Sequence, residues 1–209
     1  MEELSSPVYS KEIIEFTTVA NQLCILLEGT EKEGLNSFLD KTHKILPLLY
    51  LKATLLPALD SSYEEYNERY VTEHDYNIIK NSIAMCLGEY DTFEEVFDPL
   101  RSSHDEPAQM TISEQLADIF QDIKNFILLF QIGTEEVMYE AAWDVQQNFE
   151  QYWGQKLVNV QRALHNIVYN IKPEEGDQHK KDDNCADDNC STDTSNWLSQ
   201  AQNNFKDAQ

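Results

Sequence analysis

Glycine and proline are scarce in this chain, which has six of each in 209 residues. Globular proteins usually contain roughly 7% glycine and 5% proline, and tight turns depend on both residues. A chain with so few turn-forming residues has few places to make hairpins. Its composition therefore favours long helices joined by a small number of loops.

Basic residues are also scarce. The chain has 15 Lys and Arg against 38 Asp and Glu, which gives a formal net charge of −23. Binding to a phosphate backbone relies on Lys and Arg that displace counterions, so direct binding to nucleic acid or to an anionic membrane is disfavoured. The excess of acid favours solubility. An alternative is an acidic surface that mimics DNA and binds a basic protein.

No long hydrophobic run is present. The longest apolar stretch, 45–56, is interrupted by Pro47 and Lys52 and falls short of the roughly 20 residues that span a bilayer. Residues 1–10 lack the apolar core of a secretory signal. Four cysteines are too few for a disulfide-based scaffold. We therefore expect a cytoplasmic protein.

Apolar residues recur at helical spacing through most of the chain. The pattern predicts an all-α, single-domain bundle of five to seven helices over residues 7–172. The main predicted helices cover 10–27, 34–56, 72–87, 111–131 and 135–171. Pro47 should kink or break the second of these, because proline has no N–H and clashes with the preceding turn. The last one is expected to bend near Gly154.

Helix starts are marked by Ser10, by Thr72 with Asp75, and by Thr111 with Glu114, all of which suit N-caps or capping boxes. Residues 89–110 form the longest predicted connection, in which 94–100 has room for one or two helical turns. Cys24 and Cys86 fall on apolar helix faces and are predicted to be core residues.

The composition changes at Pro173. Residues 173–194 are acidic and nearly devoid of apolar side chains, so they cannot offset the entropy of ordering and are predicted to be a disordered linker. Residues 195–206 then predict a short amphipathic helix with one apolar stripe. This stripe is a candidate partner-binding site, formed by Trp197, Leu198, Ala201 and Phe205.

Two predicted helices carry carboxylates at four-residue spacing. These acidic ladders are Glu114, Asp118 and Asp122, and Glu136, Glu140 and Asp144. Carboxylates one turn apart can share a hard metal ion. The helical angle, however, points them away from the apolar faces, whereas metal ligands in bundles project inward. We therefore expect a solvated acidic face and keep a metal site as the alternative.

A second candidate site lies on the last predicted helix, where Arg162 and His165 stand off the apolar stripe near an aromatic residue, Trp153. This patch is suited to an anion or a partner protein, and ordinary surface residues are the alternative interpretation. In the acidic segment, Cys185, Cys190 and His179 match no standard zinc spacing. No phosphate-binding loop, nucleophile elbow or Cys-x-x-Cys motif is present, and we expect no cofactor.

Three stretches of the sequence resemble a known family. They are KILPLLYLKA at 44–53, SEQLADIFQDIK at 113–124, and YWGQKL at 152–157 continuing to RALH at 162–165. Together they are similar to an uncharacterised bacterial domain-of-unknown-function family, number 5063, over about residues 7–170. The resemblance implies a compact helical protein and transfers no catalytic residue. It draws attention to residues inside the matching stretches: Asp118, Asp122, Trp153, Arg162 and His165.

These observations favour a non-enzymatic protein-interaction or scaffold module with an unidentified protein partner. One alternative is a metal-dependent phosphoester or nucleotide hydrolase that uses the ladder carboxylates. The other is the acidic DNA mimic. The sequence leaves the oligomeric state open.

Overall fold

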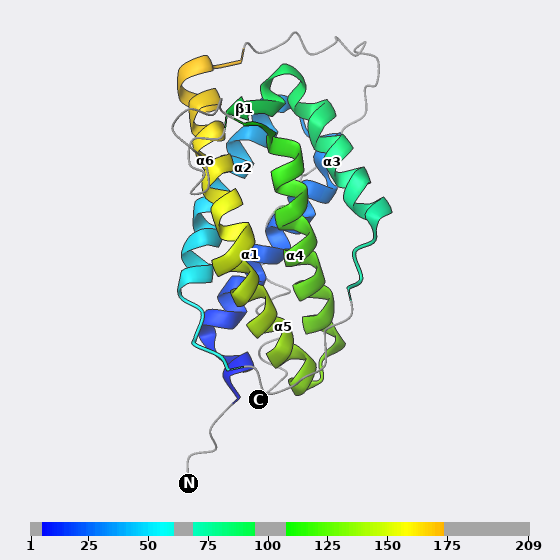
Figure 1. Cartoon of the computed structure of the whole chain (residues 1–209), viewed down its shortest axis with the longest axis vertical. Helices are drawn as coiled ribbons and strands as arrows, with labels where there is room; N and C mark the ends of the chain where they lie inside the picture. The colour runs from blue at the N-terminus through cyan, green and yellow to red at the C-terminus, as the bar shows by residue number, and fades with distance from the viewer. Residues whose placement is uncertain (1–5, 61–68, 95–107, 174–209) are drawn as a thin grey trace, which may run out of the picture. The chain divides into compact units, whose positions relative to one another are not determined.

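The chain folds as a bundle of α-helices, as its periodicity predicts (Figure 1). The structure is a computed structural model and describes residues 6–60, 69–94 and 108–173. The helices are α1 (Lys11–Glu28), α2 (Leu35–Thr54), α3 (Glu73–Leu87), α4 (Ile112–Ile132), α5 (Glu135–Asn148) and α6 (Gly154–Asn166). Short 3₁₀ turns occur at Pro7–Tyr9, Thr30–Lys32 and Gly88–Asp91.

Helix ends follow local capping chemistry. The Ser10 hydroxyl accepts a hydrogen bond from the Ile13 amide at the start of α1, and Thr72 and Asp75 form a complete capping box on α3. Thr111 accepts from the Glu114 amide at the start of α4. That end has a second cap, because the buried Asp91 carboxylate accepts from the Ser113 amide and hydroxyl at 2.7 Å each.

A small antiparallel hairpin joins α3 to α4. Strand β1 (Thr92–Glu94) pairs with β2 (Gln109–Thr111), and Phe93 lies opposite Met110. The prediction that helix could begin at Glu94 is therefore wrong, and the remainder of that predicted turn lies outside the described residues. Pairing with a strand distant in sequence replaced the local preference.

The helix predicted over 135–171 is continuous, but it contains two π-helical turns, Phe149–Trp153 and Ile167–Ile171, on either side of α6. Each π turn adds a residue to the helical repeat and rotates the side chains that follow. The predicted change in direction near Gly154 thus takes the form of a π turn immediately before that glycine.

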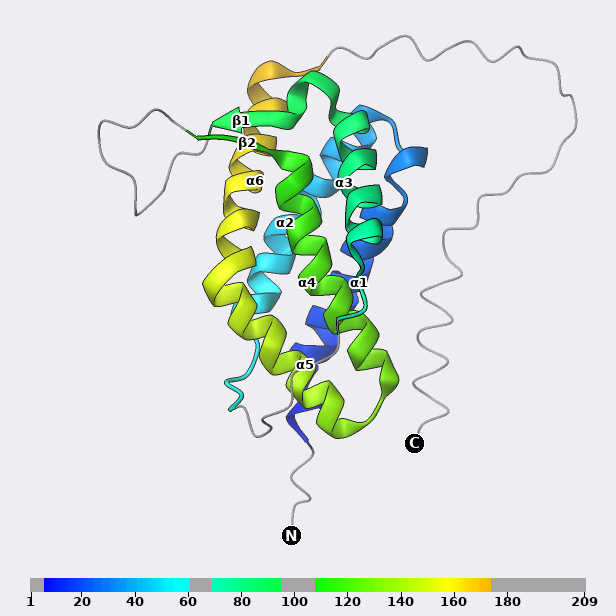
Figure 2. The same cartoon turned by 45° about the vertical axis from the view of Figure 1, so that its right-hand side comes forward.

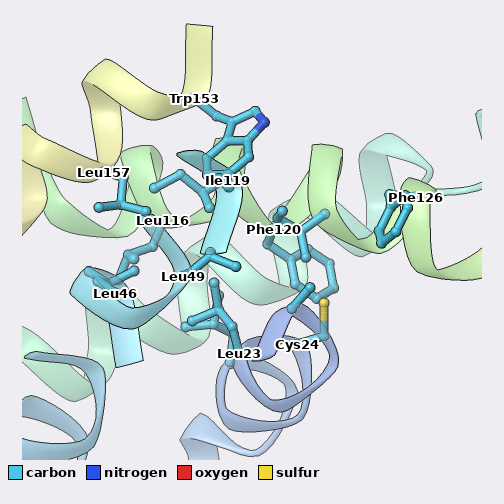
Figure 3. Packing of buried hydrophobic residues seen from close by; sticks show 14 of the residues in the cluster. Leu23, Cys24, Leu46, Leu49, Leu116, Ile119, Phe120, Phe126, Trp153 and Leu157 are labelled. Carbon is cyan, nitrogen blue, oxygen red and sulfur yellow. The ribbon is translucent and has the colours of Figure 1, made fainter. Parts of the chain in front are cut away.

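Helix α4 runs lengthwise through the bundle, with α3 on one side and the α5–α6 helix on the other (Figure 2). Its buried side chains join those of α1, α2 and α6 in one apolar core. In Figure 3, Trp153 of the π turn and Leu157 of α6 point into the same interior as Leu46 and Leu49 of α2. Cys24 is buried in this core, as predicted, and Cys86 is half-buried.

The described residues belong to one compact unit, Met1–Glu174. The predicted linker at 173–194, apart from Pro173, and the predicted helix at 195–206 lie outside the described residues. None of the helices that the structure describes combines the length and the apolar composition needed to cross a membrane.

Candidate functional site: a groove between helices α2 and α6

The orientation of α6 is set by the π turn that precedes it. Trp153 is fully buried there, and its indole N–H donates to the Val145 carbonyl at 3.1 Å. A Cβ at Gly154 would lie 2.4 Å from the Phe149 carbonyl oxygen, so only glycine fits this position. The predicted surface patch of Trp153, Arg162 and His165 is therefore wrong in one member, because Trp153 belongs to the core.

Helix α2 continues through Pro47, so of the predicted kink or break the break does not occur. Proline has no N–H to donate to the carbonyl four residues earlier, so the His43 carbonyl loses its helical partner. The Gln161 side-chain amide of α6 donates to this carbonyl at 3.2 Å. A tertiary hydrogen bond thus replaces the missing helical one and links α2 to α6 next to the proline.

A groove of about 390 Å³ runs between these two helices beside Pro47. Apolar side chains supply most of its lining, and Arg162 and His165 supply basic groups on the α6 side. The α2–α6 groove is lined by Pro47, Tyr50, Leu157, Val158, Gln161, Arg162 and His165. Two residues of the predicted patch, Arg162 and His165, are thus brought together in a concave surface.

Two histidines and a tyrosine cluster at the His165 side of the groove. The His43 and His165 ring centroids are 5.8 Å apart, and the Tyr169 ring lies 5.4 and 4.7 Å from them, respectively. The Nε2 atom of His43 is buried and has no hydrogen-bond partner. Burial and the nearby His165 lower the pKa of His43, and Asp40 opposes this effect.

An exposed apolar stripe lies beside the groove on the outer side of α2. Leu48, Leu51 and Leu55 follow helical spacing and are 43%, 51% and 50% exposed. Their helical angle is adjacent to that of Pro47 and Tyr50, which line the groove. The groove and this α2 stripe together form an exposed apolar surface. Surfaces of this kind mark interaction sites on soluble proteins.

Arg162 differs from the other cations around this surface. Lys41, Lys44 and Lys52 form ion pairs with Glu33, Asp40 and Glu15, respectively. Within the described residues, no carboxylate lies within 4.0 Å of the exposed Arg162 guanidinium. This cation is therefore available to a ligand at the groove.

The acidic ladders are arranged differently from the prediction. Glu114 and Glu136 are exposed, as expected for a solvated face, whereas Glu140 is buried and Asp118, Asp122 and Asp144 are half-buried. Neighbouring helices cover the side of α4 that was expected to face water. The solvated-face prediction is thus wrong for these four residues.

Asp118 is held by two donors from other helices. It accepts a hydrogen bond from the Tyr76 hydroxyl of α3 at 2.9 Å and forms an ion pair with Lys156 of α6. Burial alone lowers the pKa of Lys156, but the hydrogen bonds and charges of Asp118 and Tyr152 together outweigh burial, so that pKa is raised. Asp118 therefore ties α3, α4 and α6 together.

Asp122 lies one turn further along α4, beside a cavity of about 20 Å³ that it shares with Arg69 and Asp144. The cavity has room for one water molecule. Burial raises the pKa of Asp122 to about 6, and Arg69 opposes this effect. One oxygen of this carboxylate, Oδ2, is buried and has no hydrogen-bond partner among the described residues.

We call Asp118, Asp122 and Asp144 the carboxylate seam. Its neighbours are Lys156 and Arg69, and cations beside carboxylates compete with a metal ion for the same oxygens. Within the described residues, no group of three or more His, Cys, Asp or Glu side chains is placed to hold a metal ion. In the part of the chain that the structure describes, the seam contains one ion pair, Asp118 with Lys156, and Arg69 acts on Asp122 through its charge.

Sequence reasoning missed several groove residues, namely His43, Pro47, Tyr50 and Gln161. One signal in the sequence could have found them. No Asp or Glu occurs between Asp40 and Asp60, or between Glu150 and Glu174, in a chain with 38 acidic residues. These two acid-free stretches supply α2 and α6. The other predicted binding residues, Trp197, Leu198, Ala201 and Phe205, lie outside the described residues, as do His179, Cys185 and Cys190.

A solved structure and a protein-family model match this chain. The structure of protein BF1032 from Bacteroides fragilis is similar, with a TM-score of 0.72 and 42% sequence identity. The match covers 81% of this chain and 99% of that one. None of the curated proteins matches this chain. The model of one family, the domain of unknown function DUF5063, matches residues 7–170, which include the groove and the seam. This chain therefore belongs to the DUF5063 family.

Proposed function

We propose that this protein is a protein-interaction module that binds a segment of a partner protein in the α2–α6 groove. The observation that carries the proposal is the apolar groove of about 390 Å³ lined by Arg162, a cation with no ion pair among the described residues. In helix-in-groove recognition, the apolar face of an amphipathic helix binds a groove that is lined mostly by apolar side chains and has one or two polar groups.

The α2 stripe extends the surface beyond the groove. Leu48, Leu51 and Leu55 are each close to half exposed, and contiguous exposed apolar surface of this kind marks interaction sites on soluble proteins. Tyr50, which is 38% exposed, adds an aromatic side chain of the type that dominates binding energy at interfaces.

The proposal includes a second element, the apolar stripe of Trp197, Leu198, Ala201 and Phe205. Its composition supports binding to a partner, because an amphipathic segment joined to an acidic linker presents one apolar face. Deleting residues 193–209 and measuring both partner capture and melting temperature tests this element. If neither changes, the stripe has no part in the function.

A substitution in the groove tests the main proposal. Val158→Glu places a charge on the groove wall at a position that is 45% exposed, and Met85→Glu is a matched control at an 84% exposed position on α3. Both variants should melt within about 3 °C of the parent, because exposed positions contribute little to stability.

The readout is quantitative affinity capture followed by mass spectrometry, with the two variants and the parent as baits. We expect one or more proteins to be retained by the parent and by Met85→Glu and lost with Val158→Glu. A set of captured proteins that is the same for all three baits contradicts the proposal.

A further inference from the structure

The chemistry of the groove specifies its partner more closely. We infer that the α2–α6 groove recognises an amphipathic helix that has apolar anchors flanked by acidic side chains. This inference rests on the proposed function, since it names the kind of partner that the groove takes.

The first argument is the segregation of charge. The acid-free stretches that supply α2 and α6 hold six of the fifteen Lys and Arg residues, namely Lys41, Lys44, Lys52, Lys156, Arg162 and Lys172. These stretches pack against each other, as the bond from Gln161 to the His43 carbonyl shows. Among the described residues, the lining of the groove thus has no acidic side chain, although the chain has a net charge of −23.

The second argument is what the cations do. Lys41, Lys44, Lys52 and Lys156 pair with carboxylates of the chain itself, whereas Arg162 on the groove wall has no ion pair with any residue that the structure describes. A guanidinium at the edge of an apolar groove can form a bidentate hydrogen-bonded pair with a carboxylate. Its position beside Val158 and Leu157 requires that the carboxylate flank an apolar anchor.

The third argument concerns range. The net charge of the chain repels an acidic partner at long distance, but the screening length at physiological salt is about 8 Å. The groove that Arg162 lines is formed by His165, Gln161 and mostly apolar side chains. Local complementarity therefore decides binding once the partner reaches the groove, and the distant acidic residues chiefly slow its approach.

Two synthetic peptides test the inference. Both are helical with apolar anchors at i, i+3 or i+4, and i+7; one has Glu at the flanking positions and the other has Gln. Titration of the full chain at 0.15 M salt should show that the Glu peptide binds about tenfold more tightly, which corresponds to one charge-assisted pair.

Variants assign this preference to its residues. Arg162→Glu should abolish the preference for the Glu peptide and create a preference for a Lys-flanked peptide. Lys11→Glu, which changes a cation on α1 that is 80% exposed, should leave the preference for the Glu peptide intact.

Two other outcomes have different consequences for the inference and for the proposed function. Equal affinity for the Glu and Gln peptides leaves the groove as a docking site but overturns its preference for acid. Failure of both peptides to bind, with the partner capture by Val158→Glu unchanged, overturns the proposed function as well.

Three further results overturn the choice of a separate acidic helix as occupant. One is peptide binding that appears only after removal of residues 174–209, which identifies a segment of this chain as the occupant. Another is a stable dimer that excludes the peptide. The last is tighter binding of a single-stranded oligonucleotide than of the Glu peptide, with the same sensitivity to Arg162→Glu.

Discussion

The carboxylate seam and the α2–α6 groove place charge in opposite ways. In the seam, Asp118 and Asp122 lie between helices beside Lys156 and Arg69. At the groove, Arg162 is exposed and has no acidic partner among the described residues, and acidic residues are absent from both helices over long stretches. One region thus uses its charges to join helices, whereas the other leaves a charge available to solvent.

The difference shows that net charge is a poor guide to where a protein binds. A net charge of −23 suggests an acidic surface. Some of the acidic residues, however, are buried or half-buried in the bundle, and the groove is lined by apolar and basic side chains. Charge pairs inside a bundle cost desolvation and serve mainly to fix which helices meet. An unpaired exposed cation contributes little to folding, so its placement is more informative about function.

The largest predicted effect is that of a substitution at the π turn that orients α6 for both regions. In Gly154→Ala, the new methyl group must displace the Phe149 backbone, so the variant should lose roughly 3 to 4 kcal/mol of unfolding free energy. Urea denaturation measures this loss. Gly34→Ala is the control, because a Cβ there has no neighbour within 4 Å, and its effect should stay below about 1 kcal/mol.

The next prediction tests how much the ionised Asp122 carboxylate lowers the free energy of unfolding. The pKa of Asp122 in the fold, about 6, lies above its ordinary value of 3.8, so the folded protein holds this proton more tightly than the unfolded chain does. The resulting penalty is complete above pH 6 and disappears below about pH 4. Asp122→Asn should therefore stabilise the protein by about 2 to 3 kcal/mol at pH 8 and by almost nothing at pH 4.

Urea denaturation at pH 8, 6 and 4 measures this dependence. Glu114→Gln, at an exposed carboxylate on the same helix, should change stability by less than about 0.5 kcal/mol at every pH. A stabilisation by Asp122→Asn that does not vary with pH contradicts the explanation by burial.

A third prediction tests whether the seam joins helices by pairing. Asp118→Asn leaves the half-buried Lys156 without its carboxylate and should cost about 2 kcal/mol. Adding Lys156→Met should recover most of that loss, because the uncompensated charge is then removed. A double-mutant cycle measures the coupling, and additive effects would show that the ion pair contributes nothing.

The smallest predicted effect concerns the groove wall. Gln161→Leu removes the donor to the His43 carbonyl and should cost about 1 kcal/mol. In a Pro47→Ala background, the restored amide of residue 47 can donate to the same carbonyl, so the cost of Gln161→Leu should fall by at least half. Thermal denaturation of the four proteins tests this, and an equal cost in both backgrounds contradicts the role assigned to Gln161.

The sequence predicted the helices well because each one carries its own signals. The apolar stripe of α1 and its cap at Ser10 are local features, and the structure reproduces both. The sequence could not exclude a break at Pro47, because the compensating donor, Gln161, is 114 residues away in the chain and becomes a neighbour only when α2 packs against α6. The predicted surface patch included Trp153, but the structure buries this residue in the core, where its indole N–H donates to the Val145 carbonyl.

Apolar periodicity and capping residues specify the all-helical fold and the approximate ends of the helices. The packing of the helices against one another places Asp118 and Asp122 beside other helices and brings Arg162 and His165 into one groove with Pro47. Periodicity gives the angle of a side chain around its own helix. For Asp118 it correctly predicted an angle away from the apolar face, although that side of the helix is not exposed to solvent. What occupies that side of the helix depends on how several helices pack together, and no single helix encodes that arrangement.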